Sequence, residues 1–196
     1  LFHDVDNLLT HPHGDVLCQQ MTELKRQGLV DRIGISVYQT EQVEQALNRF
    51  DFDLVQAPVN VFDQRFVETK VATLFKHNQL ALHARSAFLQ GLLLMSLDSI
   101  PAYFSPFSQQ LDKFSCLAKQ YQVSNLTLAL AFLVHNSLKE FGSEDEFRGD
   151  VLDKPEKLQP TNLIEQIVVG CCSAKQLSEI LTSYLIAKTL NIPSHA

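Results

Sequence analysis

Apolar residues along this chain follow two alternating spacings. Short runs of mainly apolar and β-branched residues predict strands, and apolar residues three or four positions apart predict helices. The predicted strands lie at 1–3, 32–35, 53–57, 80–84 and 164–169. The predicted helices lie at 16–27, 41–49, 64–76, 107–122 and 124–136, with a last one after residue 173. This alternation predicts an α/β fold whose parallel sheet is buried on both faces.

Polar residues mark the expected starts of these helices. Thr40, Asp63, Ser124 and Ser173 precede the helical patterns, and each side chain has an oxygen that can accept a hydrogen bond from a first-turn N–H. Gly28 is the expected end of the first helix, because glycine readily adopts a positive φ. The boundaries of most elements are therefore predicted by local chemistry as well as by hydrophobic spacing.

Two architectures fit this alternation, a barrel and a doubly wound sheet. A doubly wound dinucleotide fold carries a G-x-G-x-x-G turn after its first strand, and this chain has seven glycines and no such turn. A complete (β/α)8 barrel takes about 250 residues, whereas this chain shows five strand starts. Residues 1–196 are therefore expected to form a single domain, a partial TIM barrel of strands four to eight with flanking helices. Residues 139–162, charged and aperiodic, are expected to form a long surface excursion.

Composition narrows the function classes. With 45% hydrophobic residues, 196 residues can bury one sizeable core. The formal net charge of −6 gives no positive field that would attract nucleic acid or an anionic membrane, and the apolar runs are shorter than the roughly 20 residues that cross a bilayer. Four cysteines, two of them adjacent, do not suggest a disulfide framework. A cytoplasmic protein that acts on small molecules is expected.

Four segments at the C-terminal ends of predicted strands carry a resemblance to a known family. They are RIGIS at 32–36, DLVQAPVN at 53–60, ARSAFLQGLL at 84–93 and VGCCS at 169–173. In order and spacing they resemble signature segments of bacterial aldo-keto reductases, and together they span nearly the whole chain. Barrel enzymes also place their functional groups at the C-terminal ends of strands. The resemblance implies reduction of aldehydes or ketones by hydride transfer from NADPH.

The resemblance assigns a catalytic role to His3. This residue matches the family's histidine, which orients the substrate carbonyl and can donate a hydrogen bond to the developing alkoxide. The Asp, Tyr and Lys that complete this machinery in the family would lie upstream of Leu1, so the chain is expected to be a fragment that lacks them. Without the resemblance, a strand-end histidine bonded to a backbone carbonyl is the simpler interpretation.

The resemblance also implies a set of residues around the nicotinamide ring. Ser36 and Gln56 match positions that hold the carboxamide, a planar group that needs one donor and one acceptor. Val37 stands where the family usually has Asn, so one carboxamide contact is missing. Arg85 stands where many relatives place an aromatic side chain, and a guanidinium can stack on the same ring face. Asn60 is expected to order its own loop instead.

The phosphates and the adenosine are expected to lie further along the same edge. The resemblance implies contacts at Ser86, Leu89, Gln90, Gly170, Ser173, Lys175 and Gln176. Backbone N–H groups of the first three can approach the pyrophosphate, and the helix start at Ser173 offers a positive dipole end to a phosphate. Cys171 and Cys172 stand where relatives often carry Arg or Lys, so NADH is not excluded. A plain capped helix at Ser173 is the alternative.

Two other interpretations compete with the reductase. His11, His13 and Asp15, with the nearby His3 and Asp4, have ligand chemistry for zinc or another transition metal, although a solvated loop explains them more simply, and no metal site is predicted. The second is a non-catalytic partial barrel that binds a nucleotide or a partner protein. An incomplete barrel would also leave unpaired strand edges, which predicts self-association. The loops give no cue to the identity of the carbonyl substrate.

Overall fold

The computed structural model describes residues 1–137 and 163–190, so the predicted surface excursion at 139–162 lies outside the described residues. The main elements are α1 (Val5–Thr10), α2 (Gly14–Arg26), β1 (Gly34–Ser36), α3 (Thr40–Leu47), β2 (Leu54–Pro58), α4 (Thr69–His77), β3 (Ala81–Arg85), α5 (Ser108–Gln120), α6 (Asn125–Ser137), β4 (Ile164–Ile167) and α7 (Ala174–Thr189). Short 3₁₀ turns lie at Arg65–Val67, Leu89–Leu94, Leu97–Ser99 and Ala102–Phe107. The predicted helices are all present, and so are the strands predicted at 32–35, 53–57, 80–84 and 164–169. The strand predicted at 1–3 is present only as an isolated bridge at Phe2, and α1 is an element that hydrophobic spacing did not predict.

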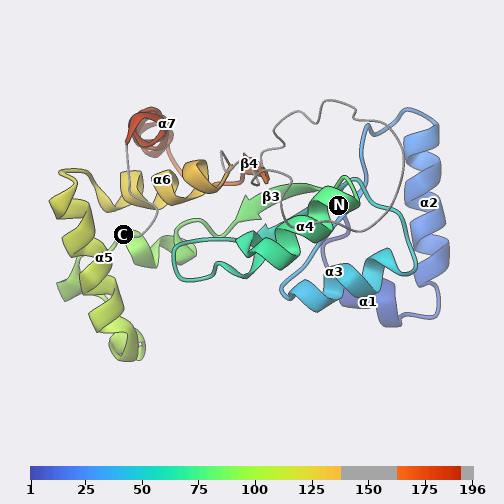
Figure 1. Ribbon diagram of the computed structural model, residues 1–196, viewed down its shortest axis with the longest axis horizontal. Helices are drawn as coiled ribbons and strands as arrows, with labels where there is room; N and C mark the ends of the chain where they lie inside the picture. The colour runs from blue at the N-terminus through green and yellow to red at the C-terminus, as the bar shows by residue number, and fades with distance from the viewer. Residues whose placement is uncertain (138–162, 191–196) are drawn as a thin grey trace, which may run out of the picture.

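The four strands form one parallel sheet in the order β1-β2-β3-β4. Phe2 extends the sheet by one residue, because it forms an isolated parallel bridge with Ile35 on the side of β1 away from β2. Helices α1 and α2 lie at one end of the molecule and α5 at the other, with the sheet between them (Figure 1). The predicted α/β class and parallel sheet are therefore confirmed.

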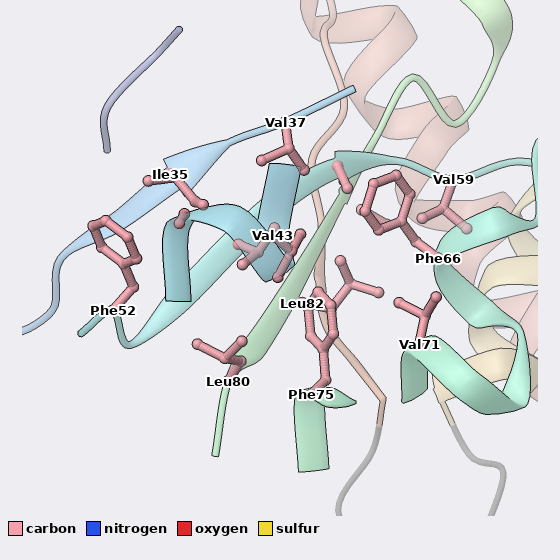
Figure 2. Packing of buried hydrophobic residues seen from close by; sticks show 14 of the residues in the cluster. Ile35, Val37, Val43, Phe52, Val59, Phe66, Val71, Phe75, Leu80 and Leu82 are labelled. Carbon is pink, nitrogen blue, oxygen red and sulfur yellow. The ribbon is translucent and has the colours of Figure 1, made fainter. Parts of the chain in front are cut away.

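One face of the sheet is apolar and packs on helices. Ile35, Val55 and Leu82, one from each of three neighbouring strands, are at most 1% exposed. They share a cluster with Val43 of α3 and Phe75 of α4. Figure 2 shows Ile35, Leu82, Val43 and Phe75 between the strands and the helices. Full burial of one such side chain stabilises the fold by about 1.5–3 kcal/mol. This cluster therefore fixes which face of each strand points away from the helices.

Two of the predicted helix starts were wrong by a few residues. Helix α3 begins at Thr40 itself, and its N-cap is Gln39, whose side chain forms a capping box with Gln42. Asp63 does not cap a helix; α4 begins only at Thr69 after a 3₁₀ turn, with Glu68 at its N-cap position. Near the first start, Gln39 pairs with Gln42, and near the second, Asp63 pairs with Arg65. The cap preference of a single residue does not predict such pairings.

The other predicted boundaries are confirmed. Ser124 accepts a hydrogen bond from the backbone N–H of Thr127 at 3.0 Å at the start of α6. Ser173 accepts one from the N–H of Gln176 at 3.2 Å at the start of α7. Gly28 follows α2 with a φ of +71°. None of the helices in the described part of the chain is long and apolar enough to cross a membrane.

Helix α7 packs on α6 through small residues. Ser183 and Ala187 are its buried positions, because small side chains allow two helices to approach closely. Hydrophobic spacing predicts that Leu177, Ile180, Leu181 and Leu185 lie on one side of this helix. Ile180 packs against the buried cluster that includes Ala187, whereas Leu177, Leu181 and Leu185 are 44%, 54% and 65% exposed. The described chain therefore leaves the three leucines uncovered.

Candidate functional site

Polar side chains gather on the sheet face opposite the apolar core. Successive strand residues point to opposite faces, so the neighbours of the buried Ile35, Val55 and Leu82 point away from the helices. These neighbours are Ser36, Gln56 and His83, and they are aligned across β1, β2 and β3. Carboxyl ends of parallel strands meet at one edge of a sheet, which brings the polar residues that follow them together.

His3 lies at this same edge. The backbone N–H of Phe2 donates to Gly34 O at 2.8 Å, and the N–H of Ser36 donates to Phe2 O at 2.7 Å. Phe2 packs against the apolar core, so His3, the next residue, belongs to the opposite face beside Ser36. Its side chain is exposed. The structure therefore brings together the predicted catalytic residue and the predicted carboxamide residues.

Ser36 and Gln56 keep their side-chain hydrogen-bonding groups available. Within the described residues, neither the Ser36 hydroxyl nor the Gln56 amide has a hydrogen-bond partner, and neither side chain buries an unsatisfied polar atom. Ser36 is nevertheless only 6% exposed. A hydroxyl and an amide that sit side by side supply both a donor and an acceptor. This pair fits the planar amide that the sequence predicts for it.

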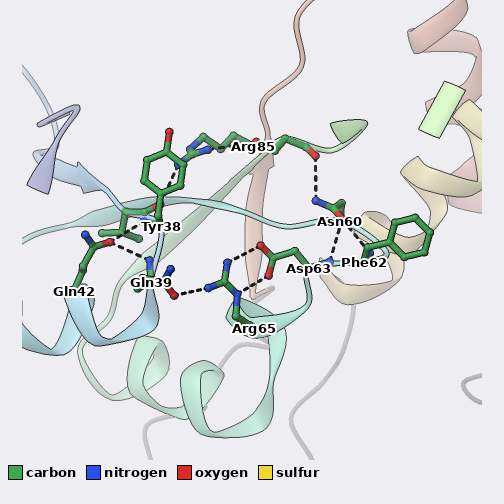
Figure 3. Close-up of polar contacts among 10 residues, drawn as sticks. Tyr38, Gln39, Gln42, Asn60, Phe62, Asp63, Arg65 and Arg85 are labelled. Atoms are coloured by element: carbon green, nitrogen blue, oxygen red, sulfur yellow. Dashed lines mark hydrogen bonds and ion pairs between the residues drawn. The ribbon is translucent and has the colours of Figure 1, made fainter. Parts of the chain in front are cut away.

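Arg85 crosses the end of the sheet above Gln56. From the end of β3 its Nη2 donates to the carbonyl oxygen of Val37 at 3.0 Å, and its Nη1 donates to Ser86 Oγ at 3.3 Å. The guanidinium carbon lies 4.2 Å from the centre of the Tyr38 ring. Arg85 therefore spans β2 and rests on Tyr38, which follows β1 (Figure 3). The sequence predicted neither this stack nor a role for Tyr38.

The loop after β3 is conformationally strained. Ser86, Leu89 and Gln90 have positive φ values of 59°, 47° and 55°, and Gly91 follows with 93°. For a residue with a side chain, the left-handed region costs roughly 1–2 kcal/mol. Such strain concentrates at functional sites, where surrounding contacts hold the backbone in place. The three strained residues are the ones that the resemblance places along the pyrophosphate.

A hydrogen-bond network connects the segments that follow β1, β2 and β3 (Figure 3). Gln39 accepts a hydrogen bond from Arg65 at 2.5 Å, and Gln42 donates one to Asp6 of α1 at 2.8 Å. Arg65 also pairs with Asp63 through two 2.8 Å contacts. Because Arg65 donates two hydrogen bonds to it, the pKa of the Asp63 carboxyl lies below its usual range. The network keeps the loops at fixed positions relative to each other.

Asn60 completes this network, as expected for a residue that orders its own loop. Its Oδ1 accepts the backbone N–H groups of Phe62 and Asp63, both at 3.0 Å. Its Nδ2 donates to Ser86 O at 3.3 Å, which links the loop after β2 to the loop after β3. Asn60 is 1% exposed and has no free group for a ligand.

An ion triad of Arg32, His83 and Glu165 extends the polar row from His83 toward the starts of the strands. Arg32 Nη1 donates to both carboxylate oxygens of Glu165 in β4, at 3.0 and 2.8 Å, although β2 and β3 lie between them in the sheet. His83 Nε2 lies 3.1 Å from the same carboxylate. The pKa of Glu165 is lowered, chiefly by the hydrogen bonds from Arg32. The triad spans the polar face and links its two sides.

After the last strand, two of the residues predicted to contact the adenosine, Ser173 and Gln176, stabilise the start of α7. Ser173 caps α7, and the side-chain Oε1 of Gln176 accepts a hydrogen bond from the backbone N–H of Cys172 at 2.7 Å. Lys175 is 87% exposed and lies 3.9 Å from Glu179. Gly170 has open space around it. A capped helix explains Ser173 and Gln176 here, and the Nε2 of Gln176 and the open backbone at Gly170 remain available to a ligand.

The region considered as a metal site has another structure. His11 and His13 lie between α1 and α2, and the backbone N–H of His13 donates to His11 Nδ1 at 3.1 Å. Asp15 pairs with Arg49 at 2.8 Å. Residues 1–137 and 163–190 contain no group of three side chains arranged to hold a metal. The residues form a turn between two helices.

A cleft of about 590 Å³ lies away from these residues, between α2 and the starts of β1 and β2. It is lined by Cys18, Lys25 and Asp53, and the last two form an ion pair with each other. Burial raises the pKa of the Cys18 thiol, which makes this cysteine a poor nucleophile. The cleft is on the opposite edge from the functional groups of barrel enzymes.

A parallel sheet with its polar residues at the C-terminal ends of the strands is typical of α/β barrel enzymes. The Aldo/keto reductase family model matches residues 1–190. The chain therefore belongs to the aldo/keto reductase family, and the resemblance found in the sequence is confirmed. Among curated proteins, none matches it.

Solved structures with a similar fold come from the same family. The apo form of aldo-keto reductase AKR11C1 from Bacillus halodurans is 14% identical, with a TM-score of 0.61 over 92% of this chain and 56% of that chain. Its holo form is also 14% identical, with a TM-score of 0.58 over 87% of this chain and 50% of that chain. The thermostable aldo-keto reductase Tm1743, in complex with the inhibitor epalrestat, is 17% identical, with a TM-score of 0.52 over 89% of this chain and 53% of that chain. These likenesses show the fold, and the chain spans about half the length of these relatives.

Four residues of this face were missed from the sequence: Arg32, Tyr38, His83 and Glu165. A signal existed for two of them, because His83 and Glu165 interrupt otherwise apolar strands at positions that alternate with buried residues. Arg32 and Tyr38 flank a strand, where polar residues are ordinary. Their partners lie 133 and 47 positions away in the chain, and no local pattern connects them.

Proposed function

We propose that this chain contributes the cofactor-holding part of an NADPH-dependent reductase of aldehydes or ketones. The observation that carries the proposal is the pair of Ser36 and Gln56, which are register partners on the polar face near Arg85 and whose side chains have no hydrogen-bond partner among the described residues. A bound NADPH would supply the hydride. Ser36 and Gln56 would hold its carboxamide, and the strained loop 86–91 would lie along its phosphates.

In this proposal His3 acts on the substrate. Its exposed ring at the C-terminal edge can donate a hydrogen bond to the carbonyl oxygen, which stabilises negative charge as it develops there. The five strand positions correspond to strands four to eight of the barrel. The Asp, Tyr and Lys of the family's chemistry would then stand outside residues 1–196.

The choice between NADPH and NADH depends on the adenosine end. Cys171 and Cys172 are exposed and carry no charge that would favour a 2′-phosphate. Lys175 is the nearest cation in the chain sequence, and its pairing with Glu179 is loose. NADPH as the cofactor rests on the family resemblance, and NADH is expected to compete with it for the same site.

Calorimetric titration of the purified chain with NADPH tests the proposal. Gln56→Ala removes both a donor and an acceptor to the carboxamide, and two net hydrogen bonds correspond to a loss of affinity of about tenfold or more. Gln45→Ala is the matched control, because Gln45 is an exposed glutamine on α3. A wild-type chain that does not bind NADPH, or a Gln56→Ala chain that binds it equally well, would contradict the proposal.

The alternative, a non-catalytic binding module, is supported by the uncovered edges of the fold. On the described residues, β4 pairs with β3 alone and Phe2 pairs with β1 alone. The exposed leucines of α7 form a second apolar surface that the described chain leaves uncovered. We propose that a second copy of the chain covers this edge and these leucines, since unpaired edges and large apolar patches favour association.

Light scattering during chromatography tests this association, with a dimer of the 22.1 kDa chain as the expected species. Leu181→Glu places a charge on the leucine stripe and should give the monomer. Thr182→Glu places the same charge on an exposed position of α7 beside the stripe and should leave the dimer intact. A monomeric wild-type chain would rule the association out.

A further inference from the structure

The stacked pair of Tyr38 and Arg85 places a fixed positive charge at the mouth of the candidate site. Two hydrogen bonds and one ring face hold the guanidinium, and its acceptors are a neutral carbonyl and a neutral hydroxyl. No carboxylate pairs with Arg85 in the described part of the chain. Its charge is therefore uncompensated at this position, unlike that of Arg65 or Arg32.

The path of the Arg85 side chain places its charge next to Ser36 and Gln56, the two residues proposed to hold the nicotinamide carboxamide. Arg85 leaves β3, crosses the end of β2 and reaches Val37, which directly follows Ser36. Gln56 belongs to β2, two residues before Pro58, the register partner of Arg85. A ring whose amide is held by Ser36 and Gln56 must then lie close to the guanidinium.

We propose that Arg85, held in place by Tyr38, makes the site discriminate between the two redox forms of the cofactor. This inference rests on the proposed function. The oxidised nicotinamide ring carries a positive charge and the reduced ring is neutral, so a fixed cation beside the ring disfavours the oxidised form alone. Tyr38 is a positioning residue in this scheme, because its ring attracts the guanidinium and limits its movement. The site would favour the reduced cofactor and release the oxidised product.

Titration of the full chain with NADPH and with NADP⁺ measures this preference as the ratio of the two dissociation constants. Both nucleotides carry the same phosphates, so any attraction between Arg85 and the phosphates cancels in the ratio. Two unit charges a few ångströms apart near a protein surface repel strongly enough for about a tenfold effect. Arg85→Gln should therefore lower the wild-type preference for NADPH by about tenfold, and Arg49→Gln, which removes a distant arginine, should leave it unchanged.

Two further comparisons separate charge from folding and from phosphate binding. Tyr38→Phe keeps the aromatic face and should keep the preference, whereas Tyr38→Ala should lose most of it. The compound 2′-phospho-ADP-ribose lacks the nicotinamide ring. Its affinity should therefore change little, and to the same extent, in Arg85→Gln and Arg85→Lys. A preference that survives Arg85→Gln would overturn this inference while leaving the proposed function intact. A wild-type chain that binds neither nucleotide would overturn both.

Discussion

The two faces of the sheet have opposite chemistry. The face toward α3 and α4 is built from apolar side chains, and Ile35, Val55 and Leu82 are essentially without exposure. The other face presents Ser36, Gln56, His83, Arg85 and Glu165. Helix packing needs the first face alone, so the second face is free to carry polar groups. The difference indicates that one set of alternate strand residues stabilises the fold, which leaves the other set free to carry the polar groups proposed to bind the cofactor.

The polar face is nevertheless not simply exposed surface. Ser36 and His83 are 6% and 9% exposed, and burial of polar groups is costly unless they find partners. His83 has Glu165 as its partner, whereas the Ser36 hydroxyl has none within the described residues. The polar face therefore contains one region that is internally satisfied and one that retains hydrogen-bonding capacity.

The largest effect is expected on the apolar face. Phe75→Ala removes a side chain that is 1% exposed between α4 and the strands, and it should lower the free energy of unfolding by about 3–5 kcal/mol. Phe62→Ala removes the same atoms from a 45% exposed position and should cost about 1 kcal/mol or less. Urea denaturation of both variants measures the difference. Equal losses would mean that the core is not where the structure places it.

An intermediate effect is expected at Gly34, where β1 lies close to the backbone of β2. A Cβ at Gly34 would lie 2.2 Å from the carbonyl oxygen of Leu54, so Gly34→Ala must push β1 away from β2. Overpacking of this kind costs about 1–3 kcal/mol. Gly170→Ala meets no atom within 4 Å and should be neutral. Thermal unfolding of the two variants compares them directly, and an unchanged melting temperature for Gly34→Ala would contradict the strand spacing.

The smallest effect is expected from the ion triad, and it depends on pH. Glu165→Gln should lower stability at neutral pH by about 1 kcal/mol or less, because Arg32 and Glu165 are both more than a third exposed and water screens the pair. The pKa of Glu165 is lowered in the folded state, so its contribution is present above the unfolded value of about 4.3 and is lost as the pH falls through the folded pKa. Wild type and variant should therefore converge in acid. A difference that persists at about pH 2 would exclude this ion pair as its source.

Sequence pattern predicted the elements better than their ends. Strand and helix alternation follows from hydrophobic spacing, which is local, and all four strands of the sheet lie within two residues of the expected positions. Asp63 and Thr40 were wrong as caps because Arg65 and Gln39 form pairings that compete with capping. The short helix α1 was missed because six residues give too little periodicity.

Candidate residues were predicted through the family resemblance, and the structure adds the contacts between them. The strained backbone at Ser86, Leu89 and Gln90 agrees with a functional loop. Sequence alone could not predict these positive φ angles, because only glycine commonly indicates such a conformation. The assignment of His3 and of the adenosine residues stays a prediction. The fold gives these positions a common edge, and binding experiments must decide their roles.

The sequence by itself determined the fold class, the order of the elements and the family, because hydrophobic alternation and short segments at strand ends are local properties. Only the tertiary structure decided which polar residues meet. Tyr38 with Arg85, and Arg32 with Glu165, are distant in the chain and adjacent in space. Their pairing depends on strand register and sheet twist, which arise when the apolar face packs as a whole and which no single segment specifies.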